Sequence, residues 1–159
     1  MPICQSRDVA FIINDDPQLA LEMGADGVHI GADDPNYKET RKTVGDDAIV
    51  GVSCYDSKHA AMVAAEDGAN YIAFGAFFPT KTKTPRACPD AQLLAWWNEL
   101  MVIPSVAIGG INTENCAELV KEGTDFVAVI AGVWEYPQGP KAAVQKFNEI
   151  FKTVHESIA

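Results

Sequence analysis

Six short apolar segments recur along the chain, and each is followed by a stretch with the signals of a helix. The segments that predict β-strands cover residues 9–13, 27–31, 48–53, 71–74, 105–108 and 126–130. The stretches that predict helices cover residues 17–23, 34–45, 59–67, 90–97, 113–123 and the chain after 140. Strands and helices that alternate in this way are typical of a parallel sheet with its helices outside.

Capping signals mark the ends of several predicted helices. Asp16-Pro17 and Asp34-Pro35 each combine an N-cap residue with a proline at the first helical position. The last helix is amphipathic, because apolar residues recur in it three and four positions apart. These residues are Val144, Phe147, Ile150, Phe151 and Val154.

A weak repeat joins three helix ends to the strands that follow them. Its copies are Gly24-Ala-Asp-Gly-Val, Gly68-Ala-Asn-Tyr-Ile and Gly123-Thr-Asp-Phe-Val. The glycine suits a left-handed helix cap, and we expect the Asp or Asn to tighten the turn.

The spacing of the units favours a barrel over an open sheet. Six units in 159 residues give roughly 26 residues each, close to the unit of a (β/α)8 barrel. The alternative, a doubly wound sheet, usually has a glycine-rich fingerprint after its first strand, which this chain lacks. We therefore predict an α/β fold of the TIM (β/α)8-barrel type, with about six of the eight βα units, as a single partial barrel domain over residues 1–159.

Composition narrows the function classes. The net charge of -10 argues against a general nucleic-acid binder. No apolar run approaches the length of a membrane span, and the first residues do not have the pattern of a signal peptide. The four cysteines are far apart and form no Cys-x-x-Cys motif, which favours reduced thiols in the cytoplasm over a zinc site or disulfides.

Two acids stand at the ends of neighbouring predicted strands. Asp15 ends the first strand and Asp34 lies just past the second. Parallel strands lie about 4.8 Å apart, so the two carboxylates can share one Mg²⁺, which takes one or two carboxylates and phosphate oxygens. The alternative for each acid is local: Asp34 as an N-cap and Asp15 as a turn residue.

Two further features suit a phosphorylated ligand. Thr80, Lys81, Thr82 and Lys83 follow a strand and offer charge-assisted hydrogen bonds, although a solvated surface loop has the same composition. Gly109-Gly110 and Ala131-Gly132 follow the last two strands, where the backbone N–H groups of barrel loops bind phosphate; tight turns are the alternative.

Five motifs, in order along the chain, resemble those of the thiamine-phosphate synthase family. They are Phe11-Ile-Ile-Asn-Asp15, Ala25-Asp-Gly-Val-His-Ile-Gly31, Gly51-Val-Ser53, Pro79-Thr-Lys-Thr-Lys83 and Ala107-Ile-Gly-Gly-Ile111. The resemblance implies a TIM-barrel transferase that condenses 4-amino-2-methyl-5-hydroxymethylpyrimidine pyrophosphate with a thiazole phosphate, releasing pyrophosphate. Its partners would be small phosphorylated substrates rather than nucleic acid or membrane.

The resemblance also implies a role for each matching residue. Asp15 and Asp34 correspond to magnesium ligands, and Lys83 and Ser53 are the catalytic candidates. The implied substrate-binding residues are Asn14 and Lys83 for pyrophosphate, His29 and Ser53 for the pyrimidine, and Thr80, Thr82, Gly110 and the backbone of Ile130 for the thiazole phosphate. Considered alone, His29 and Ser53 also suit a packed core histidine and a strand-end hydroxyl.

The chain departs from the family pattern at several points. The first two barrel units and a Gln-x-Arg-x-Lys strand motif are missing, so we expect an N-terminally shortened member whose complete form has about 50 more residues. Open strand edges would then favour a homo-oligomer. Ala32 replaces a common Gln, and Ala131 a common Ser.

Two other functions remain open at this point. A related thiazole tautomerase uses a His where this chain has Ala76, and generally lacks the loop of threonines and lysines. The second alternative is a non-catalytic barrel fragment that binds phosphorylated ligands.

Overall fold

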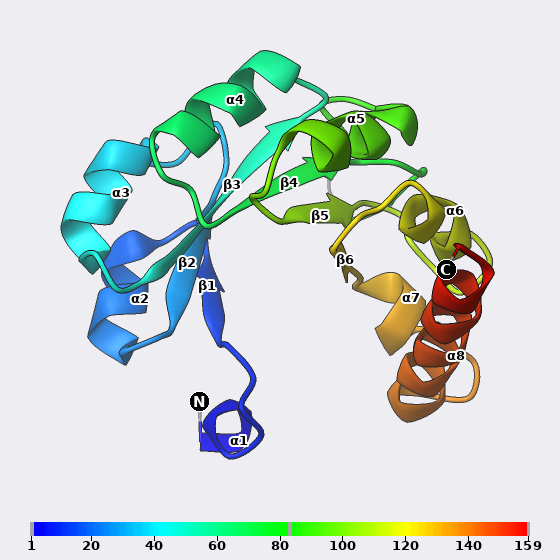
Figure 1. Ribbon diagram of the computed structural model, residues 1–159. Coiled ribbons are helices and arrows are strands. Elements are labelled where there is room, and N and C mark those ends of the chain that lie inside the picture. Colours follow the sequence, from blue (N-terminus) through cyan, green and yellow to red (C-terminus); the bar gives the residue numbers. More distant parts are fainter. Residues whose placement is uncertain (1, 83, 159) are drawn as a thin grey trace. The chain divides into compact units, whose positions relative to one another are not determined.

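The computed structural model describes residues 2–82 and 84–158, which form two compact units divided between Ile72 and Ala73. Figure 1 shows the elements of both. Each unit is built from parallel strands that alternate with helices, as the sequence predicts. The expectation of a single domain stays a prediction.

The first unit contains three complete strands and the start of a fourth. Its elements are α1 Pro2–Gln5, β1 Ile12–Asn14, α2 Pro17–Met23, β2 Gly27–Ile30, α3 Tyr37–Val44, β3 Ile49–Tyr55, α4 Lys58–Glu66 and the first residues of β4, Tyr71–Gly75. β1 pairs with β2 and β2 with β3, both parallel. The start of β4 lies beside β3, where Asn70 N–H donates to the Val50 carbonyl at 2.9 Å. A doubly wound sheet of order 3-2-1-4 would put β4 beside β1, so this neighbourhood excludes that order.

The two faces of this sheet have different roles. Val28, Ile30 and Val50 are at most 2% exposed and pack with Ala20 of α2. Burying each of these Val or Ile side chains contributes roughly 1.5–3 kcal/mol. Because side chains alternate along a strand, His29 and Gly51 lie on the opposite face, and they are register partners. The helices therefore cover one face and leave the other for the polar residues.

The second unit holds the rest of β4 and two more strands. Its other elements are α5 Gln92–Leu100, β5 Ser105–Ile108, α6 Cys116–Lys121, β6 Phe126–Ala128, α7 Ala131–Trp134 and α8 Pro140–Ile158. β5 and β6 are parallel partners. Phe74 of β4 is fully buried and meets Trp97 of α5 edge to face, with ring centroids 5.6 Å apart. The Trp97 indole N–H donates to the Ile103 carbonyl at 2.8 Å, so this buried polar group is satisfied.

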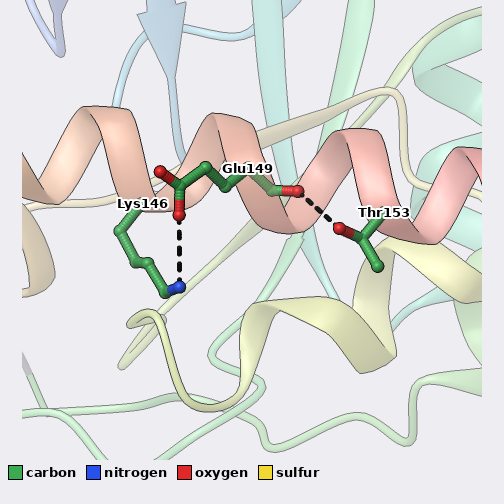
Figure 2. A network of polar contacts seen from close by, with 3 residues as sticks. All are labelled: Lys146, Glu149 and Thr153. Atoms are coloured by element: carbon green, nitrogen blue, oxygen red, sulfur yellow. Dashed lines mark hydrogen bonds and ion pairs between the residues drawn. The ribbon is translucent and has the colours of Figure 1, made fainter.

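Helix α8 has one buried and one solvated face, as predicted. Ala143, Phe147 and Val154 are buried. On the exposed side, Figure 2 shows Lys146 paired with Glu149 at 3.2 Å and the Thr153 hydroxyl donating to the Glu149 carbonyl at 2.9 Å. A pair of this kind contributes only about 0.2–0.5 kcal/mol, so the apolar face holds the helix in place.

The repeated Asp or Asn forms a bond to the neighbouring strand, which differs from the turn-tightening role we expected. Asp26 accepts the Phe11 N–H at 2.7 Å, Asn70 the Val50 N–H at 2.8 Å, and Asp125 the Ser105 N–H at 2.8 Å. Each side chain thus ties the start of its own strand to the start of the preceding one. The left-handed glycines are confirmed: φ is 58° at Gly24, 100° at Gly68 and 87° at Gly123.

Several predicted boundaries differ from those of the structure. Asn36, not Asp34, caps α3, because its side chain accepts the Glu39 N–H. α6 begins at Cys116 rather than near Thr113, and β1 begins at Ile12 rather than Val9. By contrast, Asp16 caps α2 as predicted, accepting the Leu19 N–H at 2.9 Å. Within the described residues, no helix is both long and apolar enough to cross a membrane.

Candidate active site

Three polar side chains on neighbouring strands of the first unit form a hydrogen-bonded row. His29 of β2 lies between Tyr71 of β4 and Ser53 of β3. Its Nδ1 is 2.9 Å from the Tyr71 phenol oxygen, and its Nε2 is 2.8 Å from the Ser53 Oγ. The predicted pair of His29 and Ser53 is thus brought together, on the sheet face opposite the helices.

The row depends on a glycine for its space. A Cβ built on Gly51 would lie 1.9 Å from Cζ of Tyr71, so the phenol ring occupies the place of the missing side chain. Burial raises the pKa of Tyr71 to about 12, so its hydroxyl stays protonated at neutral pH. His29 and Tyr71 have ring planes inclined by 15° with centroids 5.5 Å apart.

The end of β1 brings two predicted residues next to the row. Asn14 is the register partner of His29 and is exposed. The following residue, Asp15, has a left-handed φ of 69°, and its N–H donates to the His29 carbonyl at 2.8 Å. A left-handed conformation costs a non-glycine residue roughly 1–2 kcal/mol, and such strain concentrates at functional sites.

Asp34 lies past β2 and shapes the loop there. Its Oδ2 accepts the Gly31 N–H at 2.7 Å, and the Ala32 N–H donates to the Tyr55 hydroxyl at 3.2 Å. Among the hydrogen bonds of the described residues, only Oδ2 of this carboxylate is engaged. Oδ1 therefore remains for a further partner. Tyr55 itself ends β3 with a left-handed φ of 57°.

The donor chemistry of this end of the sheet fits Mg²⁺. Asp15 and Asp34 supply carboxylates from neighbouring strand ends, and Mg²⁺ completes its shell with water and phosphate oxygens. Within the described part of the chain, no group of three or more His, Cys, Asp or Glu side chains forms an all-protein metal site. A Mg²⁺ ion held by Asp15 and Asp34 would therefore take its remaining ligands from water and from a phosphorylated ligand.

In the second unit, the loop after β4 is held against the loop after β5. Phe77 N–H donates to the Ile108 carbonyl and Phe78 N–H to the Gly109 carbonyl, both at 3.1 Å. A Cβ on Gly110 would lie 2.5 Å from the Pro79 oxygen and 2.7 Å from the Phe78 oxygen. Gly110 also has a φ of 67°, so both its conformation and its close approach require glycine.

The threonines of this loop have different surroundings. The half-buried Thr80 hydroxyl accepts the Thr82 N–H at 3.2 Å, whereas Thr82 is exposed. This bond uses Thr80 as an acceptor and leaves its hydroxyl proton for another partner. Lys83, predicted to hold pyrophosphate, lies outside the described residues.

The segment after β6 approaches the loop after β5. Ile130 precedes α7, is 56% exposed, and its carbonyl accepts the N–H groups of Val133 and Trp134. A Cβ on Gly132 would lie 2.4 Å from the Ile111 oxygen. The Asn115 side chain also holds the loop after β5, because its amide group donates a hydrogen bond to the Gly110 carbonyl at 3.0 Å. Gly110 and the backbone near Ile130, predicted for the same ligand, thus lie on adjoining segments.

Comparison with known proteins assigns the chain to one family. Residues 1–133 match the model of the thiamine monophosphate synthase family. The thiamine-phosphate synthase of Rhodospirillum centenum is 57% identical over 151 residues, which are 95% of this chain and 73% of that protein. The chain belongs to this family. The Hyphomonas neptunium thiamine-phosphate synthase is 48% identical over 96% of the chain and 69% of its own length.

A solved structure of the same family confirms the fold. The thiamine phosphate pyrophosphorylase from Pyrococcus furiosus superposes with a TM-score of 0.85 at 32% identity, covering 96% of this chain and 72% of that one. The predicted α/β fold of the TIM-barrel type is therefore confirmed.

Tyr71 had no part in the candidate site predicted from the sequence, and Gly51 entered it only as the first residue of the Gly51-Val-Ser53 motif. Tyr71 opens a segment of apolar residues and was interpreted as part of a buried strand. The sequence signal for the Tyr71 contact was Gly51 inside β3, because a glycine in the interior of a strand often marks a place where another group packs closely against the backbone.

Proposed function

We propose that this chain carries out the condensation of its family, joining a pyrimidine pyrophosphate to a thiazole phosphate to give thiamine phosphate and pyrophosphate. The proposal rests on family membership over residues 1–133 and on identities of 48–57% to thiamine-phosphate synthases. It is supported by the hydrogen-bonded row of the first unit and by the glycine-lined loops of the second.

In the first unit, His29 and Ser53 bind the pyrimidine and Asn14 contacts the pyrophosphate. Asp15 and Asp34 hold Mg²⁺, which supplies positive charge against the charge that develops on departing pyrophosphate. The left-handed backbone of Asp15 and its N–H bond to the His29 carbonyl fix the backbone position from which this carboxylate extends, beside the pyrimidine residues. Rigid placement of this kind accounts for a large part of catalysis when a reaction needs little proton transfer.

In the second unit, Thr80, Thr82, Gly110 and the backbone at Ile130 bind the thiazole phosphate. Backbone N–H groups and hydroxyls make strong hydrogen bonds to phosphate oxygens. Lys83 and Ser53 are the catalytic candidates, Lys83 as a charge for the leaving pyrophosphate and Ser53 as a group that orients the pyrimidine.

The two alternatives are less well supported. The alanine side chain at position 76 carries no group for proton transfer. Its Cβ would also lie 2.2 Å from a Cβ built on Gly109, so there is no room for a side chain at Gly109 either. A tautomerase that needs a histidine at this point is therefore disfavoured. A non-catalytic ligand-binding role is separated from synthase activity only by experiment. The four cysteines are unpaired, which supports the cytoplasmic location that we propose.

The test is product formation by the purified chain. The two substrates are supplied with Mg²⁺, and thiamine phosphate and pyrophosphate are measured separately. Asp34→Asn is expected to lower turnover at least tenfold, roughly 1.4 kcal/mol of barrier. Asp47→Asn, which makes the same change at an exposed turn, is the matched control. Binding of thiazole phosphate without any product would instead establish the non-catalytic role, and equal turnover of the two variants would reject the magnesium assignment.

A further inference from the structure

The hydrogen bonds of the row of Tyr71, His29 and Ser53 have a donor-to-acceptor direction, which is set by Tyr71 at one end of the row. Within the described part of the chain, the Tyr71 phenol oxygen has no hydrogen-bond partner other than the Nδ1 of His29. Because burial raises the pKa of Tyr71 to about 12, the phenol keeps its proton at neutral pH. That proton needs an acceptor, and Nδ1 is the one it has.

The chemistry of the two groups favours the same direction. Of the two possible bonds, the one from O–H to nitrogen joins the more acidic proton to the more basic acceptor. The reverse bond, from Nδ1–H to oxygen, would leave the phenol proton without an acceptor in a partly buried place, at a substantial cost. The imidazole proton therefore resides on Nε2, which donates to the Ser53 Oγ at 2.8 Å.

We propose that Tyr71 is a positioning residue that holds His29 in the Nε2–H tautomer and thereby turns the Ser53 hydroxyl into a hydrogen-bond donor toward the ligand. With one Ser53 lone pair occupied by Nε2–H, its O–H points to an acceptor atom. A ring nitrogen of a heteroaromatic substrate is such an acceptor, whereas an exocyclic amino group is a donor and does not satisfy it. The identity of the ligand as a pyrimidine rests on the proposed function; the tautomer does not.

The backbone provides room for this arrangement. Gly51 lies opposite His29 in the β2–β3 register, and the Tyr71 ring lies over it. An alanine Cβ at position 51 would lie 1.9 Å from Cζ of Tyr71. The clash is with a rigid aromatic ring, not with the end of a flexible side chain, so the whole ring would have to move. Gly51→Ala therefore displaces the Tyr71 hydroxyl while keeping every polar group of the row, which complements Tyr71→Phe.

The experiment is nitrogen-15 NMR of the imidazole side chains, which distinguishes the two neutral tautomers directly. It is run at mildly alkaline pH on the full chain without substrate. The chain has three histidines, and the exposed His59 and His155 serve as internal references. His29→Gln identifies the His29 signals. We expect His29 to show the Nε2–H pattern, and Tyr71→Phe and Gly51→Ala to shift it toward the mixture of the reference histidines.

Two NMR results would overturn the proposal: an Nδ1–H pattern in the parent chain, or an unchanged His29 pattern in Tyr71→Phe. The first needs no variant, so it decides even where a variant fails to fold. In the active chain, Tyr71→Phe is also expected to lower kcat/KM for the pyrimidine substrate roughly two- to tenfold, the effect of one hydrogen bond, with KM for the thiazole phosphate unchanged. A parent chain without turnover would reject the proposed function and leave the tautomer result standing.

Discussion

Replacing Gly110 by alanine tests whether the loop after β5 is built around a missing side chain. The φ of 67° costs alanine roughly 1–2 kcal/mol. The new Cβ would also lie 2.5 Å from the Pro79 oxygen, which must retreat by roughly 0.9 Å to reach the 3.4 Å of ordinary contact. Such a shift strains the 3.1 Å bond from Phe78 N–H to the Gly109 carbonyl, worth about 0.5–1.5 kcal/mol. We therefore expect a loss of about 2–3 kcal/mol in the free energy of unfolding.

The matched control is Gly139→Ala. Gly139 has a φ of 84°, and a Cβ there would have nothing within 4 Å, so this variant has the conformational cost without the clash. Urea unfolding followed by tryptophan fluorescence gives both free energies, and titration calorimetry gives the affinity for thiazole phosphate. We expect Gly110→Ala to lose more stability than the control and to bind the phosphate at least tenfold more weakly. Equal stability losses together with equal affinities would refute the close-packed loop as the phosphate site.

Four further predictions concern stability and thiol reactivity. Burial raises the pKa of Cys54 from 9.0 to about 12, so the folded state keeps the thiol proton to a higher pH than the unfolded state does. The free energy of unfolding should therefore fall as the pH rises from about 9 toward 12, and it should fall less in Cys54→Ala. Urea unfolding at several pH values measures both. Thiol labelling of the native chain should modify the exposed Cys88 and spare Cys54 until the chain unfolds. Asn70→Ala should cost about 1–3 kcal/mol, because it leaves a buried backbone N–H of Val50 without its partner, and a change below 0.5 kcal/mol would contradict this role. Phe74→Ala should cost about 3–5 kcal/mol and alter the fluorescence of Trp97, its edge-to-face neighbour; a smaller loss in thermal unfolding would argue against the packed core of β4.

The strands could be predicted from the sequence because each is a short apolar segment closed by glycine or a polar pair. β5 matches its prediction residue for residue, since Pro104 and Gly109 bound it on both sides. The start of α3 could not be predicted in the same way, because Asp34 and Asn36 are both good N-caps. The Asp34 carboxylate instead accepts the Gly31 N–H, and Asn36 caps the helix.

Asp15 and Asp34 could be predicted from the sequence pattern, because each carboxylate ends or follows a predicted strand. His29 and Ser53 were predicted only through the resemblance to the family, and the structure brings these two side chains into contact. Tyr71 was missed because a tyrosine at the start of an apolar strand suggests packing, and its contact with His29 bridges 42 positions in the chain. Such contacts depend on which strands become neighbours, which local patterns do not encode.

The bonds from Asp26, Asn70 and Asp125 also carry information about the origin of the fold. Each joins the even-numbered strand of a pair to the odd-numbered strand before it, so the chemistry repeats every two strands rather than every one. A strand–helix–strand segment that supplies its own closing bond is a natural module for duplication, because a copied segment brings the acceptor and the donor together. Chimeras cut between such pairs should therefore fold better than chimeras cut within them, which makes the pair a practical unit for recombining barrels of this family.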